Sequence, residues 1–141
     1  MYSSLTSIEE SLRPVPIMVY SALIIEDNEG LRIVLAEMLA QLGFSVIGAR
    51  DGTEAMRLLE GTLPTLITLD INIPGVSGLN VLRHIRQAKG SDQTTVVVLS
   101  GDHPTDHAEA AALADMFLVK PVGMGTLVTL AERIMHDPEK T

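Results

Sequence analysis

The most restrictive feature of the sequence is the stretch from Thr65 to Gly75, a nearly continuous apolar run that ends in Asp70 and is then broken by Pro74 and Gly75. A run of this kind predicts a strand that is buried on both faces, as in a parallel sheet. Such a strand delivers Asp70 to the carboxyl edge of the sheet, where open α/β sheets bind their ligands. An acid at a strand end is also common in turns and helix caps, so Asp70 alone does not define a site.

Four other apolar runs have the length and the branched side chains of buried strands, and they lie at residues 18–25, 44–48, 94–99 and 116–119. Apolar residues at helical spacing, together with capping residues, predict helices at about 30–42, 51–61, 79–89, 104–114 and 124–136. Strands that alternate with helices join by right-handed crossovers into a parallel sheet that helices cover on both faces. The sequence therefore predicts an α/β fold, a doubly wound five-stranded parallel sheet with five helices.

We expect one domain, at residues 18–136, because 141 residues with 46% apolar content suit a single core. Pro14 and Pro16 flank one valine and prevent regular strand pairing, so residues 1–17 are predicted to form a flexible N-terminal extension. Residues 137–141 follow the last predicted helix as a C-terminal tail. We therefore expect no output domain in this chain.

The charge of the chain excludes several classes of function. Ten Lys and Arg residues against 18 Asp and Glu residues give a formal net charge of −8, which repels nucleic acid and favours cations. There is no cysteine, so disulfides and thiolate metal sites are impossible. No apolar run approaches the roughly 20 residues that span a bilayer. The simplest expectation is a soluble cytoplasmic protein.

Polar residues stand at the ends of four predicted strands, and they are Glu26, Asp27, Asp70, Ser100 and Lys120. The carboxyl ends of parallel strands share one edge of the sheet, so these side chains are expected to converge. Two unit charges about 5 Å apart repel by roughly 3 kcal/mol at an effective dielectric constant of 20, so clustered carboxylates require a cation. Oxygen ligands in an acidic pocket favour Mg²⁺.

The same residues predict chemistry at Asp70. Lys120 supplies a positive charge beside that carboxylate, and Ser100 supplies a hydroxyl. A divalent ion, an ammonium and a hydroxyl around one carboxylate form a cradle for three phosphoryl oxygens while the carboxylate attacks phosphorus.

In combination, Glu26-Asp27, Asp70, Ser100 and Lys120-Pro121 resemble the five-part signature of the receiver domains of two-component response regulators. The resemblance extends over about residues 18–136. It implies a CheY-like, flavodoxin-like fold with strand order 2-1-3-4-5. It also implies that Asp70 takes its phosphoryl group from a histidine kinase or a histidine phosphotransfer protein.

The resemblance further implies a set of ligands for Mg²⁺ or Mn²⁺, namely Glu26, Asp27, Asp70 and the main-chain carbonyl of Asn72. Ser100 would be the switch hydroxyl, Lys120 would pair with the phosphoryl group, and Phe117 stands where the family keeps an aromatic switch residue. The Lys120-Pro121 bond is usually cis in the family. Val122 departs from the family pattern, because a second aromatic residue often follows this proline.

The family also sets expectations about activity and partners. A receiver domain is not a conventional turnover enzyme, although it catalyses its own aspartyl phosphorylation and slow dephosphorylation. Phosphorylation would switch a surface formed by the fourth helix, the fifth strand and the fifth helix, where an unidentified effector protein would bind. We expect a monomer or a phosphorylation-dependent dimer, with no nucleic acid or membrane as partner.

Three alternatives come from the same residues. Asp70-Ile-Asn72 resembles the Asp-x-Asp signature of phosphatases with an aspartate nucleophile, but Asn72 cannot transfer a proton. A binding module that is never phosphorylated generally lacks one or more of the site residues, and this chain lacks none. Nucleotide binding is disfavoured because the turn after the first strand is not glycine-rich.

Two further expectations concern the surface. The helical pattern places Leu31, Val34, Leu35, Met38 and Leu42 toward the core and leaves Ile33, Ala36 and Ala40 on the outer side of the first helix, which in the family lies against the kinase. The histidines, at positions 84, 103, 107 and 136, show no metal-ligand spacing and are predicted to be surface residues. Among them, His103, with Asp102, would lie close enough to the site to influence loss of the phosphoryl group.

Overall fold

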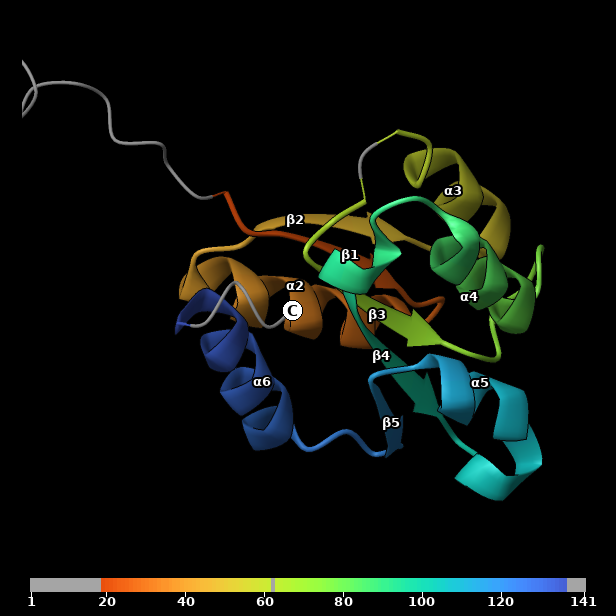
Figure 1. The fold of residues 1–141 in the computed structure, drawn as a ribbon. Coiled ribbons are helices and arrows are strands. Elements are labelled where there is room, and N and C mark those ends of the chain that lie inside the picture. The colour runs from red at the N-terminus through yellow and green to blue at the C-terminus, as the bar shows by residue number, and fades with distance from the viewer. Residues whose placement is uncertain (1–18, 62, 137–141) are drawn as a thin grey trace, which may run out of the picture.

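The computed structural model describes residues 19–61 and 63–136, so the extension and the tail predicted at the two ends lie outside the described residues. Five strands alternate with helices along the chain (Figure 1). The strands are β1 (Ser21–Ile25), β2 (Ser45–Ala49), β3 (Leu66–Asp70), β4 (Thr95–Ser100) and β5 (Met116–Val119). The α-helices are α2 (Glu29–Leu42), α3 (Gly52–Leu58), α4 (Gly78–Gln87), α5 (Ala108–Leu113) and α6 (Met124–His136). Two short 3₁₀ helices, η1 (Ser91–Gln93) and η2 (Pro104–His107), precede β4 and α5.

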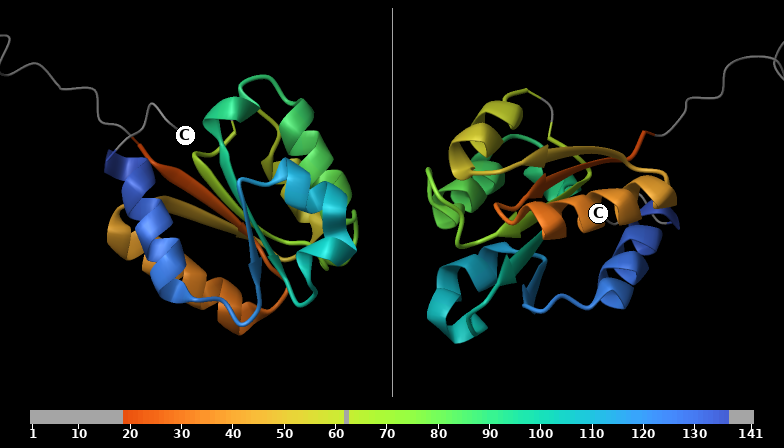
Figure 2. Two further views of the ribbon diagram at one scale, coloured as in Figure 1. Left: turned by 60° about the horizontal axis from the view of Figure 1, so that its bottom comes forward. Right: turned by 180° about the vertical axis from the view of Figure 1, so that it is seen from behind.

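All five strands are parallel, in the order β2-β1-β3-β4-β5, which confirms the predicted fold and the strand order that the family resemblance implied. Helices α2 and α6 cover one face of the sheet, and α3, α4 and α5 cover the other (Figure 2). None of the described helices is long and apolar enough to span a membrane.

The central strands are buried on both faces, which explains their nearly continuous apolar sequence. Every residue of β3 and β4 is buried. In β3, Leu66 packs toward α2 and α6, whereas Ile67 and Leu69 pack on the opposite face. The alternation of side chains along a strand therefore contributes to two separate cores.

The predicted helix boundaries hold where a capping residue marks them. Asp51 caps α3 by accepting a hydrogen bond from the backbone N–H of Glu54, and α2 ends at Gly43, whose φ of 109° lies in the left-handed region that glycine adopts at little cost. The single helix predicted at 104–114 is wrong. His107, at φ −136° and ψ 53°, leaves the helical region and divides the segment into η2 and α5.

The predicted inner face of α2 needs one correction. Val34 was assigned to the core but is 46% exposed, and Ala36, assigned to the outer side, packs partly against the core between α2, α6 and the sheet. Only Leu35 and Leu39 are fully buried in this helix. The buried face of α2 is therefore narrower than the apolar sequence pattern predicts. It includes Ala36 and excludes Val34.

The loop between β3 and α4 is held close against the end of the sheet. A Cβ atom on Gly78 would lie 2.4 Å from the carbonyl oxygen of Ile71, so only glycine permits this approach. The backbone N–H of Gly52, at the start of α3, donates to the carbonyl oxygen of Pro74 at 2.9 Å. These contacts fix the chain directly after Asp70.

Candidate functional site

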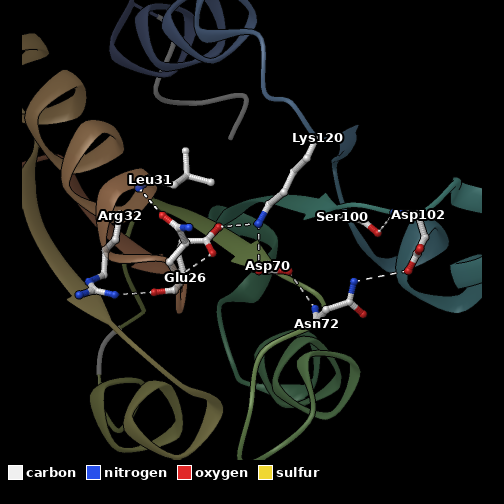
Figure 3. Close-up of polar contacts among 9 residues, drawn as sticks. Glu26, Leu31, Arg32, Asp70, Asn72, Ser100, Asp102 and Lys120 are labelled. Atoms are coloured by element: carbon white, nitrogen blue, oxygen red, sulfur yellow. Dashed lines mark hydrogen bonds and ion pairs between the residues drawn. The ribbon is translucent and has the colours of Figure 1, made fainter.

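The polar residues predicted at the strand ends lie together at the carboxyl edge of the sheet. Glu26 directly follows β1, Asp70 ends β3, Ser100 ends β4 and Lys120 directly follows β5. Figure 3 shows the Lys120 side chain reaching from the β5 end toward Glu26 and Asp70. The prediction that these side chains meet at one edge of the sheet is therefore confirmed, whereas their chemical roles stay predictions.

One ammonium group contacts two carboxylates in this cluster. Lys120 Nζ donates a hydrogen bond to Asp70 Oδ2 at 3.0 Å and lies 3.0 Å from Glu26 Oε1. Glu26 is completely buried and Asp70 is 4% exposed, whereas the Lys120 side chain keeps 27% of its surface exposed. With Asp27 beside them, three acids share a single positive charge.

The pKa values of Glu26 and Lys120 reflect this excess of acids over positive charge. Burial raises the pKa of the Glu26 carboxyl, and the charge of Asp70 adds to the increase, although Lys120 and the backbone N–H of Asn28 oppose it. Burial lowers the pKa of the Lys120 ammonium, but its contacts with Glu26 and Asp70 outweigh that effect, and the pKa lies above its ordinary value. The site favours additional positive charge near Glu26.

Backbone groups hold both buried acids in place. The backbone N–H of Asn28 donates to Glu26 Oε2 at 3.1 Å, and that of Asn72 donates to Asp70 Oδ1 at 2.9 Å. The Arg32 guanidinium of α2 donates to the main-chain carbonyl of Glu26 at 2.8 Å. The carboxylates are thus oriented before any ligand binds. The contributions of Asn28 and Arg32 were not predicted, although Asn28 is a recognisable N-cap residue for α2.

The acids fit a hard divalent cation. Glu26, Asp27 and Asp70 each offer a carboxylate oxygen, and these oxygens lie within 4.8 Å of one another. Glu26 Oε1 is buried and lies 3.0 Å from the Lys120 ammonium, which also binds Asp70. One ammonium does not balance this group of acids, and a bound cation would offset the remaining negative charge. An oxygen-only donor set is the kind that Mg²⁺, Ca²⁺ and Mn²⁺ prefer.

Ser100 and Phe117 lie farther from the acids. Ser100 is completely buried, and its Oγ accepts a hydrogen bond from the backbone N–H of Asp102 at 2.9 Å, which leaves the hydroxyl hydrogen for another acceptor. Phe117 is partly buried in β5, opposite Val98 of β4. The Lys120-Pro121 peptide bond is cis, as the family resemblance implied.

A second polar cluster borders the site and was only partly expected. Asp102 Oδ2 lies 3.1 Å from His107 Nε2 and accepts a long hydrogen bond, 3.5 Å, from the side-chain amide of Asn72. His107 and Asn72 lower the pKa of the Asp102 carboxyl. His103, predicted to accompany Asp102, instead caps η2 by accepting from the backbone N–H of Thr105. His107 was missed because its contacts depend on the break between η2 and α5.

Comparison with known families supports a single assignment. Residues 22–132 match the family described as response regulator receiver domain. The Regulator of RpoS from Escherichia coli strain K12 is 38% identical over 109 residues, which are 76% of this chain and 32% of that protein. The transcriptional regulatory protein AfsQ1 from Streptomyces coelicolor is 35% identical over 105 residues, which are 72% of this chain and 45% of that protein. The chain spans about a third to a half of the length of these two relatives.

Solved structures agree with the family match. A CheY-like response regulator receiver domain from Methylobacillus flagellatus has a TM-score of 0.71 and 28% identity, covering 82% of this chain and 98% of that chain. The response regulator TrrA from Thermotoga maritima, solved in complex with Mg²⁺ and BeF, has a TM-score of 0.70 and 27% identity, covering 82% of this chain and 99% of that chain.

Proposed function

The chain belongs to the family of response regulator receiver domains, which are the phosphoacceptors of two-component systems, and from this membership we propose that Asp70 is its phosphoacceptor. The phosphoryl donor is a phosphohistidine of a histidine kinase or of a histidine phosphotransfer protein. The domain that carries this activity spans residues 18–136. The observation that carries the proposal is the placement of Asp70, nearly buried, within 3.0 Å of the Lys120 ammonium and beside two further acids.

The proposed reaction is a displacement at phosphorus. A carboxylate oxygen of Asp70 attacks the phosphorus atom, the bond from phosphorus to the histidine nitrogen breaks, and its electron pair remains on the imidazole. Lys120, already paired with Asp70, moves to a phosphoryl oxygen of the product. Ser100, whose hydroxyl hydrogen is free of its Asp102 contact, donates to another phosphoryl oxygen. The domain is not a turnover enzyme in this scheme, since the acyl phosphate is its own modified side chain and hydrolyses slowly.

The metal in this scheme is Mg²⁺, with Mn²⁺ as a substitute. Glu26, Asp27, Asp70 and the main-chain carbonyl of Asn72 would hold the ion, which would supply positive charge for the phosphoryl oxygens. The buried Glu26 carboxylate, which shares the single Lys120 ammonium with Asp70, supports this assignment.

Two protein partners follow from the proposal. The kinase or phosphotransfer protein docks on the outer side of α2, beside the site. An effector protein, or a second copy of the chain, binds the surface formed by α5, β5 and α6 after phosphorylation. The phosphatase alternative has less support, because the Asn72 amide donates to Asp102 and cannot act as a general acid.

Intact-mass measurement with acetyl phosphate as donor tests the assignment. The parent protein should gain one phosphoryl group in Mg²⁺ or Mn²⁺ and none in excess chelator, and Asp70→Ala should gain none in either condition. Asp92→Ala, which changes an exposed acid in η1, is the matched control and should behave as the parent. Phosphorylation of Asp70→Ala, or equal phosphorylation of the parent in chelator, would show that the assignment is wrong.

A further inference from the structure

His107 lies in the polar cluster that borders the site but takes no part in the proposed phosphoryl transfer. It stands at the junction of η2 and α5, and its side chain is 24% exposed, which is low for a histidine on a surface loop. Its ring contacts two residues that belong to different parts of the site, Asp102 in the segment after β4 and Phe117 in β5.

The contact with Asp102 connects His107 to Ser100. His107 Nε2 lies 3.1 Å from Asp102 Oδ2, and the backbone N–H of Asp102 donates to Ser100 Oγ at 2.9 Å. Figure 3 shows Asp102 in contact with both Ser100, the last residue of β4, and Asn72, in the loop after β3. A movement of Ser100 toward Asp70 would therefore pull on the backbone of Asp102, whose side chain His107 holds.

The contact with Phe117 connects the same histidine to β5. The two rings are stacked, with centroids 6.3 Å apart and an interplanar angle of 29°, which is within the range of favourable aromatic pairs. Phe117 is only partly buried, so its ring has room to change position, and His107 covers one side of it. The Phe117 ring cannot leave this place without losing the stacking.

We propose that His107 is a positioning residue that holds the Phe117 ring, and through Asp102 the segment after Ser100, in the unphosphorylated arrangement. One side chain thus joins the two places that must move together when Asp70 is modified. The proposal rests on the proposed function of Asp70. In this arrangement the two contacts oppose the change at Ser100 and at Phe117 until phosphorylation supplies the free energy to break them.

Fluorine NMR separates this role from a merely structural one. The chain contains two phenylalanines, so 4-fluorophenylalanine gives two signals, and Phe44, 5% exposed in the core beside α2, serves as an internal reference. In the unphosphorylated full chain, His107→Ala should move the Phe117 signal in the direction that the parent shows when it is phosphorylated, and leave the Phe44 signal in place. His103→Ala, at the N-cap of the same 3₁₀ helix and bonded to Thr105, is the matched control and should move neither signal.

Phosphorylation rates give the second readout. His107→Ala should take a phosphoryl group from acetyl phosphate roughly two- to tenfold faster than the parent, the factor expected from the loss of one or two modest contacts that oppose the change. His107→Gln, which can still donate to Asp102, should return to within about twofold of the parent rate. If His107→Ala does not fold, Asp102→Ala removes the contact with His107 but keeps the stacking on Phe117, and should show a smaller acceleration in the same direction.

The proposal is overturned if the Phe117 signal moves no more in His107→Ala than in His103→Ala, if both fluorine signals move together, or if the rate stays at the parent value. A failure of the proposed function would look different. If Asp70 is not a phosphoacceptor, the parent takes no phosphoryl group in Mg²⁺. The fluorine spectra of the unphosphorylated proteins would still show whether His107 positions Phe117.

Discussion

At the scale of single residues, Glu26 shows how the site differs from an ordinary surface cluster. Its side chain is completely buried, burial raises the pKa of its carboxyl, and its Oε1 lies 3.0 Å from the Lys120 ammonium. Lys120 compensates only in part, because the same ammonium also binds Asp70. A buried acid that is incompletely paired lowers the stability of the fold, and a functional site is the usual reason for keeping one.

We expect Glu26→Gln to stabilise the protein in chelator by about 1 kcal/mol at neutral pH, because the neutral amide avoids the cost of a buried charge. The pKa of Glu26 is higher in the folded than in the unfolded protein. The loss of folding stability caused by the buried charge therefore grows as pH rises from about 4.5 through the folded pKa. Below this range the carboxyl is protonated in both states and the loss disappears. The advantage of Gln over Glu in thermal unfolding should therefore shrink as the pH is lowered.

Added Mg²⁺ should make the parent the more stable of the two proteins, because in the proposed site Glu26 is a ligand of the ion and the variant loses that ligand. The parent should gain more in Tm from added Mg²⁺ than Glu26→Gln does. Glu60→Gln, at an exposed glutamate, is the control and should change neither the pH dependence nor the response to Mg²⁺. A loss of stability in Glu26→Gln at neutral pH in chelator would contradict the electrostatic argument.

At the scale of elements, α2 carries more apolar surface than its packing needs. Leu35 and Leu39 are buried, whereas Ile33 and Val34 are 47% and 46% exposed on the solvent side. These two residues directly follow Arg32, which holds the Glu26 backbone at the site. Two adjacent exposed branched residues close to the proposed phosphoacceptor site fit a surface that a partner covers.

Replacing Ile33 with Glu should slow phosphotransfer from the cognate kinase roughly tenfold or more, because the charge would be buried in the docked complex. Phosphorylation by acetyl phosphate, which needs no docking, should stay at the parent rate. Ile47→Glu, at a similarly exposed isoleucine of β2, is the matched control. Equal slowing with both donors, or an effect of Ile47→Glu as large as that of Ile33→Glu, would exclude a docking role for α2.

At the scale of the whole molecule, the question is how one phosphoryl group changes a distant surface. To shift a population from 1:99 to 99:1, phosphorylation must favour the active form by about 5.5 kcal/mol. A single neutral hydrogen bond contributes only about 1 kcal/mol. In the proposed switch, the Ser100 bond, the Lys120 pair and the packing of the loops therefore act together, and we expect the change to involve β4, β5 and the segment between them.

We expect Ser100→Ala to accept the phosphoryl group, because the attacking carboxylate is unchanged. The conformational change that follows phosphorylation should be much weaker in this variant. On phosphorylation, backbone NMR shift changes across residues 101–119 should be much smaller than in the parent. Thr95→Ala, at the opposite end of β4, is the control and should keep the full response. Full-sized changes in Ser100→Ala would mean that the hydroxyl is not the trigger.

The sequence alone determined the fold class and the meeting place of the site residues. Both follow from local patterns, because buried parallel strands require nearly continuous apolar runs and all their carboxyl ends share one edge. Asp70, at the end of such a run, could therefore be placed beside Glu26 and Lys120 without a structure. The strand order came from the family resemblance, and the structure confirmed it.

Only the tertiary structure decided which side chains touch across elements. Lys120 contacts both Glu26 and Asp70, Val34 is exposed, and His107 joins Asp102 to Phe117. Sequence periodicity describes one element at a time, whereas these contacts depend on the angle at which α2 lies on the sheet and on the break in the chain at His107. Such geometry results from the packing of all the layers together, so no local pattern encodes it.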